Sequence, residues 1–130
     1  MTLHKHEVAW LPTGFDPMSV GFCPSKKAWK KEMKRLGVRN FPYPKNDGCV
    51  NWFERSKGHG HCCIVTIGSS SKDPLEIIGL ITHEVMHVWQ FTLQVMNEAS
   101  PSREFEAYSI QGLTMSVIDA YEKTRGKLTK

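Results

Sequence analysis

The sequence predicts an α+β protein in which three main helices accompany a small mixed or antiparallel sheet. Two kinds of observation lead to this fold class. One is a β-branched, apolar run at residues 61–67 that ends in a glycine and three serines; the other is a pair of helix starts that combine a capping residue with a proline. The chain has 130 residues, of which 40% are hydrophobic and 23% charged, as in an ordinary globular domain. We therefore expect one domain spanning residues 1–130.

The first of the two capped helices starts at Asp73. Asp73 is a favourable N-cap, Pro74 suits the first helical position, and Glu76 completes a capping box. Apolar residues then recur as far as Val95 around most of the helix circumference, with Gly79 as the one interruption. Such a helix is expected to be central and buried.

This helix carries the sequence His83-Glu84-Val85-Met86-His87. Positions i and i+4 of a helix share one face, so His83 and His87 can bind the same metal ion. Glu84 lies beside the coordination position that a water molecule would occupy. A carboxylate next to a zinc-bound water is the arrangement found in metal-dependent hydrolases.

A catalytic zinc site needs a third protein ligand. A histidine six residues after the second would fall at position 93, which is Leu93, so that layout is excluded. The other layout takes a glutamate from the next helix, and the candidates are Glu98, Glu104 and Glu106.

The second capped start, Ser100-Pro101, predicts a helix that runs to about Lys123 and leaves Glu98 in the preceding turn. Glu104 and Glu106 are two positions apart, so they point to nearly opposite sides of this helix. Glu104 can be read as a solvated first-turn acid favoured by the helix dipole, or as a partner that orients a ligand histidine.

The histidine motif followed eighteen residues later by Glu106-Ala107-Tyr108 resembles the gluzincin branch of the zincin metallopeptidases. The short chain also resembles small phage-encoded zincin-like proteins, and the resemblance covers residues 60–122. It implies a minimal zincin-like domain, with a small sheet packed on the central motif helix and a following ligand-bearing helix. It further implies that His83, His87 and Glu106 hold Zn²⁺, and that Glu84 is the general base of peptide-bond hydrolysis.

A second hypothesis uses the same motif differently. The chain would then be a catalytically inactive zinc-binding module that acts as a structural or regulatory partner in a larger, for example phage, assembly. The group that stabilises an oxyanion is also left open between five side chains. Of these, Tyr108 is expected to pack against its surroundings, and the others are His59, His61, Tyr43 and Tyr121.

The formal net charge of +4 is concentrated in residues 26–35. After Cys23-Pro24-Ser25 this segment predicts an amphipathic helix that ends at Gly37, with Trp29 and Met33 on the apolar side and the lysines in solvent. The lysine face is read mainly as a solvated surface, and the alternative is a patch that attracts an anionic partner.

Three further expectations concern strands, thiols and location. Strands are expected around Glu7–Leu11 and Val50–Phe53, with a long loop at residues 37–49. The four cysteines contain no Cys-x-x-Cys pair and are expected to be reduced, with the adjacent Cys62 and Cys63 facing opposite sides of a strand. No secretory signal or membrane-spanning run is visible, so a cytoplasmic location is expected, for instance in a phage-infected bacterial host.

Overall fold

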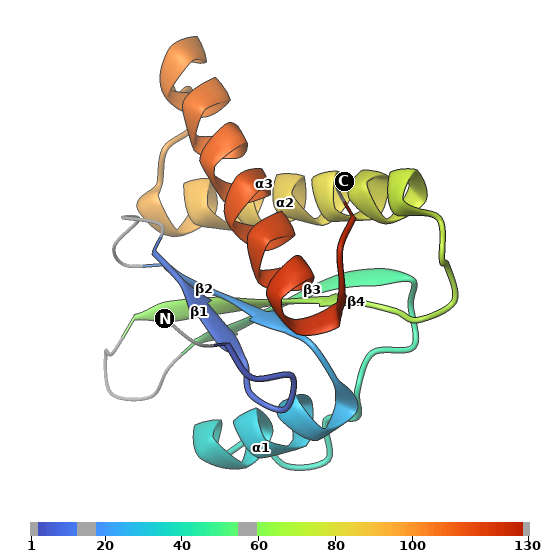
Figure 1. Ribbon diagram of the computed structural model, residues 1–130. Helices are drawn as coiled ribbons and strands as arrows, with labels where there is room; N and C mark the ends of the chain where they lie inside the picture. Colours follow the sequence, from blue (N-terminus) through green and yellow to red (C-terminus); the bar gives the residue numbers. More distant parts are fainter. Residues whose placement is uncertain (1–2, 13–17, 55–59, 129–130) are drawn as a thin grey trace.

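The computed structural model describes residues 3–12, 18–54 and 60–128. It has an α+β fold in which a four-stranded mixed sheet packs against two long C-terminal helices (Figure 1). A third, shorter helix lies on the other side of the sheet, so the predicted α+β class is confirmed. The elements in chain order are β1 Ala9–Leu11, β2 Met18–Cys23, α1 Lys26–Leu36, β3 Gly48–Glu54, β4 His61–Ile67, α2 Pro74–Met96 and α3 Arg103–Arg125.

The strands are ordered β1-β2-β4-β3, so β3 forms one edge of the sheet. Strands β2 and β4 run parallel, whereas the two outer pairs are antiparallel, with Gly48 of β3 opposite Ile67 of β4. Strand β4 has the predicted bounds, and β1 and β3 fall within or around the expected segments. Strand β2 was not predicted, because Ser19 and Gly21 interrupt its apolar pattern. Gly21 is required there, since a Cβ would lie 2.7 Å from Cγ1 of Val8.

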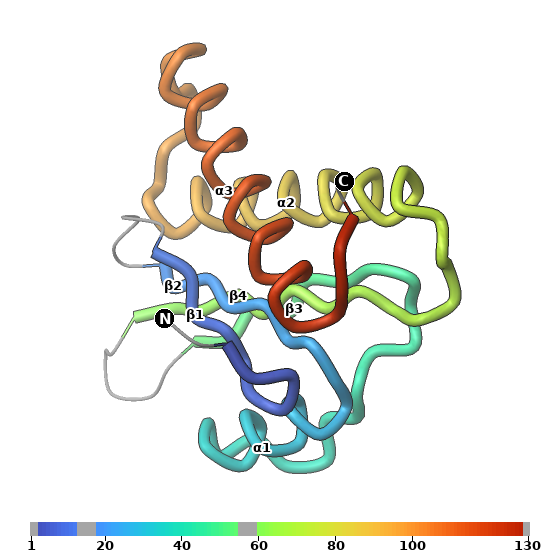
Figure 2. Tube along the Cα trace, viewed as in Figure 1, coloured from blue at the N-terminus to red at the C-terminus, as the bar shows by residue number. Residues whose placement is uncertain are grey.

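Both faces of the sheet are covered. Helices α2 and α3 lie over one face and α1 over the other, as Figures 1 and 2 show. Cys63 belongs to the core beneath α2 and α3, and Ile64 to the core beneath α1. Cys62 and Cys63 are adjacent in β4 and are both fully buried, because both faces of the sheet are covered. All four cysteines are free thiols, as predicted.

The helix starts confirm two predicted caps and correct a third. Asp73 caps α2 by accepting a hydrogen bond from the backbone N–H of Leu75, and Ser25 caps α1 in the same way through Ala28. Helix α3, however, is capped by Ser102, which accepts from the N–H of Phe105. Ser100-Pro101 therefore lies before the helix rather than starting it, because Ser102 can reach the free N–H three residues ahead.

Arg125, at the end of α3, ties that helix to the end of β4. Its guanidinium donates to the carbonyl oxygens of Ile67 and Gly68 and to the Ser69 hydroxyl, and it lies 4.9 Å from the ring centre of Tyr121. These contacts join segments almost sixty residues apart in the chain. The loop from β4 into α2 is thereby held in place at its start.

Among the described residues, no helix is long and apolar enough to cross a membrane.

We expect the substitution Arg125→Ala to lower the free energy of unfolding by about 2–3 kcal/mol, since hydrogen bonds from a charged donor contribute more than neutral ones. Lys127→Ala is the matched control, because this exposed cation forms no hydrogen bond or ion pair with the described residues. Its free energy of unfolding should change by no more than about 0.5 kcal/mol. Urea unfolding followed by circular dichroism measures both. Equal losses of stability in the two variants would mean that the contacts of Arg125 with the end of β4 do not stabilise the fold.

Candidate metal centre

His83 and His87 lie side by side on the outer surface of α2. Their Nε2 atoms are 3.2 Å apart, and the ring centroids are 4.9 Å apart with an interplanar angle of 75°. His83 is exposed and His87 half-buried, so an ion in solution can reach both. The helix therefore brings the two predicted ligand nitrogens to one point, as the i, i+4 spacing requires.

The orientation of His87 is fixed by Gln90, one helical turn further along. Nδ1 of His87 lies 2.9 Å from Oε1 of Gln90. An amide oxygen can only accept, so Nδ1 carries the proton and Nε2 presents its lone pair toward His83. Ligand histidines in metal sites are commonly held by such a bond from the second ring nitrogen. The sequence analysis overlooked Gln90, although its i, i+3 spacing from His87 was a usable signal.

Glu84 sits beside the pair but points toward the sheet. It is 5% exposed and lies against the start of β3, where a Cβ on Gly48 would be 2.8 Å from Glu84 Oε2. Burial raises the pKa of Glu84 above its usual value, while His83 and His87 act in the opposite direction. A carboxylate with a raised pKa is a better proton acceptor near neutral pH than an ordinary one.

A cleft of about 560 Å³ opens between α2 and the segment that leads into β3. His83, Glu84 and Leu80 line its helix side, and Asn46, Asp47 and Gly48 line the other. This second wall is anchored: the Gly68 N–H donates to the Asp47 carbonyl at 2.7 Å, and the Ser70 hydroxyl donates to the Asp47 carboxylate at 2.6 Å. The cleft is thus formed by α2 and by a loop that the β4–α2 connection holds.

The edge strand β3 runs along α2 beside this cleft. Its first residue, Gly48, meets Glu84, and further along Trp52 stacks against Phe91 with ring centroids 5.3 Å apart. Among the described residues β3 pairs with β4 alone and forms an edge of the sheet. An edge strand of this kind presents backbone groups that can pair with an extended chain.

Glu106, the preferred third ligand, is not brought to the histidine pair. Its Oε2 accepts a hydrogen bond of 2.8 Å from the indole N–H of Trp89. Trp89 follows His87 by two positions, which is a rotation of about 200° around the helix, so the two side chains leave α2 on nearly opposite sides. Among the described residues, no group of three or more His, Cys, Asp or Glu side chains could hold a metal ion. The ligand role of Glu106 stays a prediction.

The other acidic candidates and the oxyanion donors also lie away from the cleft. Glu98 is exposed in the turn before α3, and Glu104 is exposed in the first turn, in agreement with its reading as a solvated acid. Tyr108 is 68% exposed, so the expectation that it packs against its surroundings is wrong. At this position α3 extends beyond the helices and strands around it. Tyr43 lies under α1, Tyr121 packs on Phe22, His61 accepts from the Trp52 indole, and His59 lies outside the described residues.

We expect Gly48→Ala to destabilise the protein by about 1–3 kcal/mol, because the added methyl overlaps the buried carboxylate of Glu84. Gly112→Ala is the control: a Cβ at this helical glycine meets no atom within 4 Å, so the change should stabilise by up to about 1 kcal/mol. Chemical denaturation measures both variants. A neutral Gly48→Ala would mean that Glu84 does not occupy the space beside β3.

No protein-family model matches the chain. Comparisons with curated proteins and with solved structures likewise found no significant match.

Proposed function

We propose that this protein is a zinc-dependent peptidase of the zincin-like type, in which His83 and His87 hold the metal and Glu84 is the general base. The convergence of the two Nε2 atoms at 3.2 Å, with Glu84 directly after His83 in the same helix, is the observation that supports this most. The position of edge strand β3 alongside the motif helix also supports a minimal zincin-like domain. The zincin-like domain and the peptidase activity are proposed together, from the sequence resemblance and from this geometry.

The donor set suits zinc at two positions. Imidazole nitrogen is a preferred zinc ligand, and the bond from His87 Nδ1 to Gln90 leaves its Nε2 free to coordinate. Zinc bound there would supply a water ligand with a pKa near 7 and polarise a carbonyl group. Glu84 accepts a proton from the attacking water at its carboxylate and then passes it to the leaving amine.

The substrate class that fits is an extended peptide. Its backbone can pair with the open side of β3, which would place a scissile bond over the cleft next to His83. Asn46 lines the same cleft, and its side-chain amide is a donor of the kind that stabilises an oxyanion. These two features would supply the substrate-binding part of the site.

The role of Glu106 as the third ligand follows from the sequence resemblance and requires a rearrangement of its side chain. To coordinate a metal at the pair, its carboxylate would have to give up the Trp89 indole and approach from another side of α2. The Trp89–Glu106 bond instead favours the alternative, a zinc-binding module without peptidase activity. In that case Glu106 ties α3 to α2, and the metal serves structure or partner binding.

We expect untagged protein to bind zinc at one site, and Glu84→Gln to lower peptide cleavage by about 10²- to 10⁴-fold while zinc stays bound. Asp119→Asn is the control, since this exposed acid of α3 pairs with Lys123 and does not line the cleft, so peptide cleavage by this variant should be unchanged. Zinc content is measured by elemental analysis after dialysis, and cleavage with a broad peptide library.

The outcomes separate the two functions. Zinc binding with no cleavage of any peptide by the wild-type protein would favour the inactive module. Protein that purifies without zinc and takes none up, or cleavage that survives Glu84→Gln, would overturn the peptidase proposal.

A further inference from the structure

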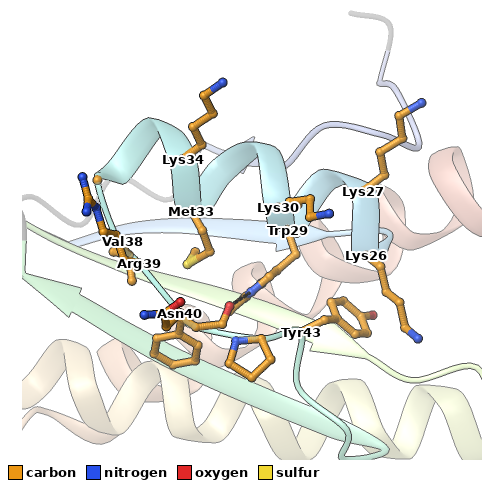
Figure 3. Close-up of a pocket in the computed structure, with 13 residues that line it drawn as sticks. Lys26, Lys27, Trp29, Lys30, Met33, Lys34, Val38, Arg39, Asn40 and Tyr43 are labelled. Atoms are coloured by element: carbon orange, nitrogen blue, oxygen red, sulfur yellow. Dashed lines mark hydrogen bonds between the residues drawn. The ribbon is translucent and has the colours of Figure 1, made fainter.

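A large open groove of about 970 Å³ lies on the opposite side of the sheet from the histidine pair, between α1 and residues 37–43 (Figure 3). Its cationic residues are Lys26, Lys27, Lys30 and Lys34 of α1 and Arg39 of the loop. All five are exposed, and no acidic residue is among the described residues that line the groove. The groove therefore carries a concentrated positive charge.

The floor of the groove is aromatic and held in place. The Trp29 indole donates to the carbonyl of Phe41 at 2.9 Å, which fixes the loop against the helix (Figure 3). Phe41 also packs edge-on against Trp29 and contacts Phe53, with ring centroids 5.6 and 5.4 Å apart. Yet Phe41 remains 39% exposed, and Pro42 and Tyr43 continue the apolar surface. An aromatic platform is thus preorganised within a cationic rim.

A second groove, of about 700 Å³, flanks α1 on its other side and shares Lys27, Lys30 and Lys34 with the first. It adds Lys5 and Lys31, with two histidines near the N-terminus. The one acid in this lining, Glu7, forms an ion pair of 2.9 Å with Lys31. Glu32 of α1 is buried and paired with Arg35. The exposed surface of α1 is therefore positive on both flanks.

We propose that this groove binds single-stranded nucleic acid, with the α1 lysines and Arg39 on the phosphates and a base stacked on Phe41. Proteins that bind single strands combine a cationic track with aromatic platforms in this way. A duplex keeps its bases stacked inside, so it could not use a platform recessed between a helix and a loop. A membrane is disfavoured, because the apolar face of α1, with Trp29 and Met33, is already buried in the protein.

The proposal does not depend on the metal site. Helix α1 packs on the sheet face opposite α2, so substitutions of its exposed lysines leave the histidine pair untouched. A nucleic-acid strand bound there would also leave the cleft beside β3 open.

The test is fluorescence anisotropy with a labelled single-stranded oligothymidine of about 12 nucleotides. If all five cations contact phosphates, a fourfold rise in salt should weaken binding by about 100-fold. The triple variant Lys26→Glu, Lys30→Glu, Lys34→Glu should bind at least about tenfold more weakly than wild type. A matched triple at exposed lysines of the α2 and α3 ends, Lys72→Glu, Lys123→Glu, Lys127→Glu, changes the net charge equally and should alter binding less than about threefold.

The platform is tested by Phe41→Leu, which keeps an apolar side chain in the floor but removes the ring. It should weaken binding of the oligonucleotide by about fivefold or more and leave the weaker binding of polyglutamate unchanged. Circular dichroism and the urea midpoint establish that each variant is folded. Equal binding of both lysine triples, or binding of duplex DNA or polyglutamate as tight as that of the single strand, would overturn the proposal.

Discussion

The way helix α2 packs on the sheet decides where the residues of the candidate metal centre lie. Ile81, Val85 and Val88 are fully buried against the sheet, while Trp89 turns toward α3. Because these positions fix the rotation of the helix, His83 and His87 are left on its outer surface. The same rotation presses Glu84 against Gly48, the first residue of the edge strand. A helix with another apolar stripe would turn Glu84 away from Gly48 and the histidine pair away from the cleft.

Coverage of both sheet faces divides the surface into two separate regions. Helix α2 and the loop before β3 form the cleft, and α1 with residues 37–43 forms the large cationic groove on the opposite face. The loop at residues 37–47 contributes to both, since Phe41 forms the floor of one groove and Asn46 lines the cleft. The cleft and the large groove share no lining residue, so the two proposed ligands would not compete for the same side chains.

Local signals in the sequence were sufficient for the elements that carry the site. Asp73 with Pro74, the run at residues 61–67 and Gly37 after an amphipathic segment predicted α2, β4 and α1. Strand β2 escaped prediction because Ser19 and Gly21 interrupt its apolar pattern, and Gly21 makes room for the side chains of Val8 and Trp10. Ser102 replaced Ser100 as the cap of α3 by one hydrogen bond, a difference that composition does not encode.

The candidate metal centre was likewise predictable only where it depends on local sequence. The i, i+4 pair follows from helix geometry alone, so its convergence could be read from the sequence. The approach of Glu84 to Gly48 depends on which strand forms the sheet edge, and the partner of Glu106 depends on how α3 crosses α2 (Figure 2). Neither contact can be predicted from the spacing of residues in the sequence.

The most direct test is a crystal structure of the zinc-loaded protein with anomalous data at the zinc edge. We expect one zinc ion with Nε2 of His83 and Nε2 of His87 at about 2.0–2.1 Å, and Glu106 as a further ligand only if its carboxylate has left the Trp89 indole. Zinc at another site, such as the N-terminal His4 and His6, with the α2 pair empty, would contradict the proposal that His83 and His87 hold the metal.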